Sequence, residues 1–122
     1  MSERKPLSPI NMPRGDRREI SFVVRDRHGT IVLDLLDEVY VTVKKRFTDE
    51  AFLFQKRLSS GTITQTEDGV YHFTIEPDDT NGLAFGEYVF DIEIIRVGTL
   101  KETRVGKLNI MQESTWAVNE VT

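Results

Sequence analysis

The chain has 122 residues, enough for a single domain with one hydrophobic core. Hydrophobic residues at 39% and charged residues at 30% are typical of a globular protein, not of a disordered or fibrous one. The absence of cysteine excludes a disulfide framework, a thiolate metal site and a cysteine nucleophile. No apolar run approaches the roughly 20 residues of a membrane span, and residues 1–13 hold no secretory-signal pattern. We therefore expect no membrane contact and a protein made in the cytosol.

The net charge of -4 is distributed unevenly along the chain. Residues 1–18 carry five basic side chains against two acidic ones, a balance of +3, which leaves -7 for the rest. Nucleic-acid binding needs a concentrated basic face, so the acidic remainder argues against it. The basic N-terminal segment is either solvated or in contact with an acidic neighbour.

Three prolines in residues 1–13 predict an extended, non-helical N-terminal arm. Gly15 and Asp16 follow as the turn that begins the first strand. They belong to the tripeptide Arg14-Gly15-Asp16, which also occurs in cell-adhesion proteins. A turn explains this tripeptide better than an adhesion motif does, because such tripeptides often arise by chance.

Alternation of apolar and polar residues with period two recurs from Ile20 onward and predicts short, half-buried strands. The first strand turns at residues 26–29 into a short return strand over 30–33. A valine-rich strand follows at 39–44, because β-branched residues favour strands over helices. The pattern then predicts a strand over 51–58 and a brief one over 62–64.

The second half of the chain continues the pattern. Glu67-Asp68-Gly69 predicts a hairpin turn, and the strand after it ends at Pro77. Residues 78–83 predict one helical turn, capped by an aspartate and ended by Gly82. Gly86 then begins the longest alternating strand, which turns at Val97-Gly98 and returns over 104–110. Gly106 is a candidate bulge within that return.

Seven or eight strands with regular turns and no long amphipathic helix predict an all-β, immunoglobulin-like antiparallel β-sandwich. We divide the chain into the arm (residues 1–13), the sandwich (14–111) and a C-terminal tail (112–122). The residues that we expect to be structural are Gly15, Asp16, Gly69, Pro77, Gly86 and Tyr88.

No group of residues carries a recognisable catalytic or metal-binding pattern. His28 and His72 have no nucleophile and carboxylate arranged around them at short range. The acidic cluster of Glu76, Asp78 and Asp79 lacks the spacing of a calcium loop, and a capped turn explains it more simply. We therefore expect no enzyme activity, no cofactor and no metal, and a small-molecule ligand is not favoured.

A resemblance to a known family appears in the order of several segments. Met12-Pro13-Arg14-Gly15-Asp16 precedes the first strand, Gly69 to Thr80 leads into Gly86-Glu87-Tyr88-Val89-Phe90, and Gly106-Lys107-Leu108 comes late. Over residues 10–110 this resembles the immunoglobulin-like domain at the N-terminus of phage baseplate upper proteins and in small phage and prophage proteins. Gly86-x-Tyr88 is similar to the tyrosine corner of such sandwiches. The baseplate proteins continue into a long fibre-forming region, whereas this sequence stops at Thr122.

The resemblance implies a non-enzymatic structural module of a tailed-phage or prophage particle, assembled in the bacterial cytoplasm into the virion. Its partners would be other virion proteins and copies of itself, bound through the sandwich, the arm and the tail. The interface candidates are Lys5, Pro9, Ile10, Met12, Trp116, Val118 and Val121.

Two other classes of function stay open. A carbohydrate- or surface-binding module would use Tyr40, Tyr71 and Trp116 as an exposed aromatic platform. An enzyme would need a pocket that joins His72 to a nucleophile such as Ser21 or Thr74.

Overall fold

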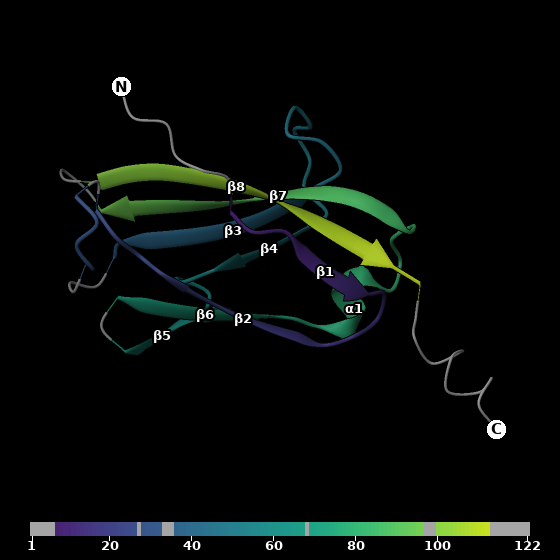
Figure 1. Ribbon diagram of the computed structural model, residues 1–122, viewed down its shortest axis with the longest axis horizontal. Coiled ribbons are helices and arrows are strands. Elements are labelled where there is room, and N and C mark those ends of the chain that lie inside the picture. Colours follow the sequence, from purple (N-terminus) through teal and green to yellow (C-terminus); the bar gives the residue numbers. More distant parts are fainter. Residues whose placement is uncertain (1–6, 27, 33–35, 68, 97–99, 113–122) are drawn as a thin grey trace.

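The computed structural model describes residues 7–26, 28–32, 36–67, 69–96 and 100–112. These residues form a mostly β fold of two sheets, with one short helix (Figure 1). The elements in chain order are β1 (Ile10–Pro13), β2 (Arg18–Val23), β3 (Glu38–Lys44), β4 (Phe54–Arg57), β5 (Ile63–Glu67), β6 (Val70–Ile75), α1 (Pro77–Thr80), β7 (Gly86–Arg96) and β8 (Leu100–Met111).

The larger sheet is curled and has the strand order β1-β8-β7-β3-β4, and the smaller sheet has the order β2-β6-β5. All pairs are antiparallel except β1 with β8, which run parallel from Ile10 opposite Leu108 to Pro13 opposite Met111. The expectation of a wholly antiparallel arrangement is therefore wrong at this pair. A parallel pair needs a long connection, and here the whole chain between its first and last described strands provides it.

The core lies between the sheets and comes from the alternating positions that the sequence predicted. On β6 the inward residues Tyr71, Phe73 and Ile75 are fully buried, and on β7 Tyr88, Phe90, Ile92 and Ile94 are buried. Val39, Val41 and Val43 of β3 complete the larger sheet's inner face. The apolar area that these strands remove from water stabilises the packing of one sheet on the other.

The N-terminal boundary differs from the predicted one. Residues 10–13, which we assigned to the arm, are extended but pair as β1. Before them, the Leu7 N–H donates to the Val105 carbonyl at 2.7 Å. Ile10 and Met12 are 8% and 1% exposed. Their interpretation as interface residues is therefore corrected, because their side chains belong to the core.

Several local features of the structure also differ from the predictions. The return strand over 30–33 reduces in the described residues to one bridge between Arg25 and Ile31, and the strand over 51–58 pairs only from Phe54 to Arg57. Gly106 forms no bulge, since β8 pairs with β7 in continuous register there. The predicted turn at Val97-Gly98 lies outside the described residues.

The glycine turns follow the prediction closely. Gly15 has φ of 83°, and its N–H donates to the Thr80 hydroxyl at 2.8 Å, while Asp16 closes the turn onto Pro13. Gly69 has φ of 76° in the β5–β6 hairpin, where a Cβ would collide with the Ile31 side chain. At both positions only glycine combines the left-handed backbone with the available space.

The helix α1 and the start of β7 form one corner of the fold. Pro77 is at the first helical position, and the N-cap is Glu76 instead of the aspartate that we predicted. The C-cap is Asn81, so Gly82 lies beyond it. After the corner, Gly86 has φ of 140° and begins β7. The hydroxyl of buried Tyr88 donates to the Ala84 carbonyl at 2.7 Å, which ties β7 to the loop before it.

Candidate functional site

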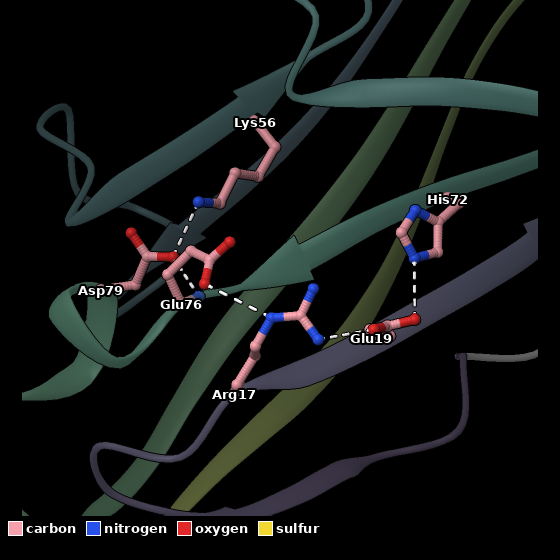
Figure 2. A network of polar contacts seen from close by, with 6 residues as sticks. All are labelled: Arg17, Glu19, Lys56, His72, Glu76 and Asp79. Atoms are coloured by element: carbon pink, nitrogen blue, oxygen red, sulfur yellow. Dashed lines mark hydrogen bonds and ion pairs between the residues drawn. The ribbon is translucent and has the colours of Figure 1, made fainter.

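A network of charged side chains lies along β2, β6 and α1 (Figure 2). Arg17 is in its centre. Its guanidinium donates to Glu19 Oε2 at 2.6 Å, and its Nε lies 3.7 Å from Glu76 Oε1. The other Glu19 oxygen, Oε1, is 3.4 Å from His72 Nε2. The network therefore joins the turn before β2 to the outward side of β6.

The electrostatics of this network are those of an exposed surface. The hydrogen bond and charge of Arg17, followed by the hydrogen bond of His72, lower the pKa of Glu19. The side chains of Arg17 and Glu19 are both 56% exposed. Solvent screens ion pairs of this kind, so the contacts of Arg17, Glu19 and His72 contribute little to stability.

The ion pair between Lys56 and Asp79, at the other end of the network, is nearly buried. Asp79 Oδ2 accepts hydrogen bonds at 2.7 Å from Lys56 Nζ and at 2.7 Å from the Glu76 N–H. The side chains of Lys56 and Asp79 are only 11% and 17% exposed. Lys56 comes from the edge strand of the larger sheet, while α1 follows the central strand of the smaller one. This pair therefore fastens the two sheets together at one edge.

Beside the network is an open pocket of about 340 Å³, which Gly61, Phe73 and the polar residues Lys56, Thr62, Thr64, His72, Thr74 and Glu76 line. It brings together His72 and Thr74, as the enzyme hypothesis required. In the described part of the chain, however, no hydrogen bond joins His72 to Ser21 or Thr74, and His72 contacts Glu19 instead. The pocket thus holds polar groups without an oriented nucleophile and base.

The predicted acidic cluster serves local structure. Asp79 is the third residue of α1, and its carboxylate accepts a hydrogen bond from the N–H of the N-cap, Glu76, while Asp78 Oδ1 accepts a long hydrogen bond of 3.5 Å from Asn81. Across the described residues, no three histidine or acidic side chains are grouped so that they could hold a metal ion. Over the same ranges, no helix is long and apolar enough to cross a membrane.

Of the three aromatic residues of the carbohydrate hypothesis, Tyr71 cannot belong to an exposed platform. Tyr71 is fully buried, and its hydroxyl accepts a hydrogen bond from the Leu36 N–H at 3.4 Å. Burial raises the pKa of this hydroxyl, against a smaller lowering by that hydrogen bond. Tyr40 is half-buried, with the Arg57 guanidinium 4.8 Å from its ring centre. Trp116 lies outside the described residues.

The other interface candidates divide into two groups. Pro9 is exposed, just before β1. Lys5, Val118 and Val121 lie, like Trp116, outside the described residues.

An apolar groove that the sequence reading missed runs along β2, with a volume of about 310 Å³. We call it the β2 groove. Residues 7–10, Ile20 to Phe22, Phe90 and Ile92 line it. Ile20 and Phe22 point toward the core but remain half-buried. The alternation of β2 showed that these side chains face inward, but a strand pattern does not reveal which strand lies at an open edge.

A group of exposed apolar residues was also missed. Phe47, Phe52 and Leu53 are 44–50% exposed in the β3–β4 loop, which projects from the larger sheet (Figure 1). Phe85, 47% exposed, precedes β7, and Met111, 44% exposed, ends β8. The register places the end of β3, the start of β7 and the end of β8 at one end of that sheet. We call these five residues the apolar end.

Comparison of the chain with protein-family models, with curated proteins and with solved structures finds no significant match.

Proposed function

We propose that this chain is an immunoglobulin-like structural module of a tailed-phage or prophage particle, positioned in the virion by contacts with other virion proteins and with copies of itself. Support for the immunoglobulin-like arrangement comes from the strand order. A sheet β1-β8-β7-β3-β4 facing a sheet β2-β6-β5 pairs strands far apart in the sequence, as Greek-key sandwiches do. The Tyr88 bond to Ala84, at the corner between β6 and β7, is the contact that a tyrosine corner makes.

The observation that carries the assembly function is the apolar end. Monomeric proteins commonly expose single apolar residues, whereas several large ones on one surface mark a site of protein contact. Three of the five are phenylalanines, and aromatic side chains are enriched in the buried centres of interfaces. Arg14, 4.2 Å from the ring centre of Phe85, adds a cation at the border of this surface.

The first experiment asks whether the chain is a particle component. Particles purified from cells that encode the chain are analysed by quantitative mass spectrometry. We expect a fixed ratio of this chain to the major structural protein in every preparation. Recovery of the chain only in the soluble fraction, with none in purified particles, would refute the assignment.

The second experiment asks whether the apolar end is the contact surface. We expect Phe47→Ser with Phe52→Ser to lower the amount of chain incorporated by about tenfold or more, since loss of one interface hot spot costs more than about 1 kcal/mol. Val105→Ser is the matched control. Val105 is 39% exposed on β8, away from this end, so its replacement should leave incorporation unchanged. Equal incorporation of both variants would exclude the apolar end as the contact.

A further inference from the structure

Within the described ranges, one edge of β2 has unpaired backbone groups to which another strand could bond. In the smaller sheet β2 pairs with β6 on one side and with no described strand on the other. The Val24 N–H donates to the Gly69 carbonyl at 2.9 Å, which continues the β2–β6 register. Because hydrogen-bonded pairs alternate along antiparallel strands, the backbone groups of Glu19, Ser21 and Val23 point to the free edge.

The β2 groove runs directly beside this edge. Its apolar side chains come from both sheets, and Ile20 and Phe22 face it without complete cover. Phe22 stacks on the buried Tyr71 ring at 5.9 Å, so the groove is continuous with the core. A strand on the edge of β2 would place every second side chain in the groove, as in recognition by strand addition.

We propose that the C-terminal tail of a second copy of this chain fills this groove: residues 113–121 add to β2 as an antiparallel strand, with Trp116 and Val118 in the groove. This inference rests on the proposed function, because it identifies how one of the proposed partners, a second copy of the chain, is bound.

One register satisfies the apolar and hydrogen-bonding requirements together. With Trp116 opposite Phe22, Val118 is opposite Ile20, and both apolar pairs face inward. Ala117 is then opposite Ser21, whose backbone groups are among those that point to the free edge. The inward pairs are consequently the non-hydrogen-bonded ones, in which side chains approach most closely.

The same register also pairs opposite charges at both ends. Glu120 comes opposite Arg18, and Glu113 comes opposite Arg25. Arg18 and Arg25 are both exposed, and each donates one hydrogen bond to a backbone carbonyl, of Asn11 and of Gly29, while a guanidinium carries further N–H donors for a carboxylate. A parallel strand could pair these charges only in the other combination, Glu113 with Arg18 and Glu120 with Arg25. It would then align Ala117 with Phe22, so Trp116 would point away from the groove. Charge and apolar patterns together therefore favour the antiparallel strand.

The chain's own tail cannot make this strand. β8 ends at Met111 opposite Pro13, close to where β2 begins. In the antiparallel register Glu113 lies beside Arg25, roughly 23 Å farther along at about 3.3 Å per residue. Gln112 alone spans at most about 3.6 Å. The added strand must therefore come from another copy.

The first test uses Trp116 as a reporter, since it is the only tryptophan of the chain. In the full chain we expect sedimentation to show association as concentration rises, with the Trp116 emission shifting to shorter wavelength in parallel. A full chain that stays monomeric throughout would overturn the proposal. So would an emission already blue-shifted in the dilute monomer, because it would place the tail on its own molecule.

The second test separates strand addition from apolar contact in general. A synthetic peptide of residues 112–122 is added to the full-length Trp116→Ser variant, so that only the peptide carries a tryptophan. N-methylation at Ala117 removes a donor to β2, whereas N-methylation at Val118 blocks an N–H that points away. We expect about tenfold weaker binding for the first peptide, which loses the hydrogen bond from the Ala117 N–H to the Ser21 carbonyl, and nearly unchanged binding for the second. Equal effects of the two modifications would overturn the strand pairing.

The third test fixes the direction of the strand. Arg25→Glu should weaken association of the full chain, and Glu113→Arg in the same chain should restore it, whereas Glu120→Arg should not. Rescue by Glu120→Arg alone would contradict the antiparallel register. Particle analysis keeps the two proposals apart: a chain that enters particles but remains monomeric in solution overturns strand exchange alone. A chain that exchanges tails but never enters particles overturns the particle function alone.

Discussion

Gly106 shows how one missing side chain sets the position of a strand. It lies opposite Phe90 on the inner face of the larger sheet. A Cβ at this position would come within 2.6 Å of Phe90 Cζ and 3.2 Å of Leu7 Cβ. The glycine therefore makes room for the Phe90 ring, and the N-terminal segment closes over it.

Gly106→Ala should lower the free energy of unfolding by about 1–3 kcal/mol, the usual range for overpacking a core. Urea denaturation measures the change. Gly82→Ala is the matched control, because its Cβ would meet no atom within 4 Å and should change stability by less than about 0.5 kcal/mol. Phe90→Leu in the Gly106→Ala background should recover part of the loss. An unchanged Gly106→Ala protein would contradict the close approach.

Asp91 is a carboxylate in an unfavourable place on the outer face of the larger sheet. Burial raises its pKa, with a further rise from Glu93, and the charge of Lys44 only partly opposes these effects. Because the folded state binds this proton more tightly, stability falls as pH rises from the unfolded pKa through the folded one.

Asp91→Asn should therefore raise the melting temperature at neutral pH, where the folded wild-type protein carries the disfavoured charge. The difference should disappear near about pH 3, below the ordinary pKa of aspartate. Thermal unfolding followed by circular dichroism across this range provides the measurement. A variant that is less stable than wild type at neutral pH would show that Asp91 has a favourable partner instead.

At the scale of elements, the edges of the two sheets are held by different interactions. At the β4 edge Lys56 and Asp79 join the larger sheet to α1 through a nearly buried ion pair. At the opposite edge Arg18 donates to the Asn11 carbonyl at 3.0 Å beside the β1–β2 turn, and farther along β2 the groove is open. An ion pair therefore joins the two sheets at the first edge, whereas the β2 groove separates them along part of the second.

Lys56→Met should destabilise the protein by about 1–3 kcal/mol, because it leaves the Asp79 carboxylate buried without its cation. Lys107→Met serves as the control. Lys107 pairs with Glu87 with both side chains 58% exposed, and such pairs contribute about 0–1 kcal/mol. Urea midpoints of both variants give the comparison. Equal effects would mean that burial adds nothing to the Lys56–Asp79 pair.

For the whole molecule, the parallel pair of β1 and β8 joins the first described strand to the last. Met12 is 1% exposed between them and the rest of the core, so the folded unit includes residues that sequence reasoning assigned to an arm. Contacts between segments so distant in the sequence form only when most of the chain is already in place.

Met12→Ala should lower the free energy of unfolding by about 2–5 kcal/mol, as expected for truncating a buried methionine. Met111→Ala, the same change at a residue 44% exposed at the end of the partner strand, should have a much smaller effect. Denaturant unfolding of the two variants tests this directly. A stable Met12→Ala protein would mean that β1 is not an integral strand.

Local patterns were sufficient for most strands and turns. Alternation along β3, β6 and β7 correctly predicted their inward residues, because the side-chain period of a strand is set by its backbone. Asp-Gly and Gly-Asp turns were equally readable, since they depend on glycine's access to positive φ. The roles of Gly106, Lys56 and Met12 could not be predicted in this way, because each depends on a partner far away in the sequence.

The amino-acid sequence alone established a cysteine-free, strand-rich chain with an acidic body and no local catalytic pattern. Tertiary structure decided that β1 joins β8 in parallel, that β2 keeps a free edge and that Phe47, Phe85 and Met111 lie at the same end. The physical reason is the distance along the sequence over which each interaction acts. Periodicity and turn chemistry act between neighbours, whereas strand order and open edges result from which distant segments bury one another's apolar faces.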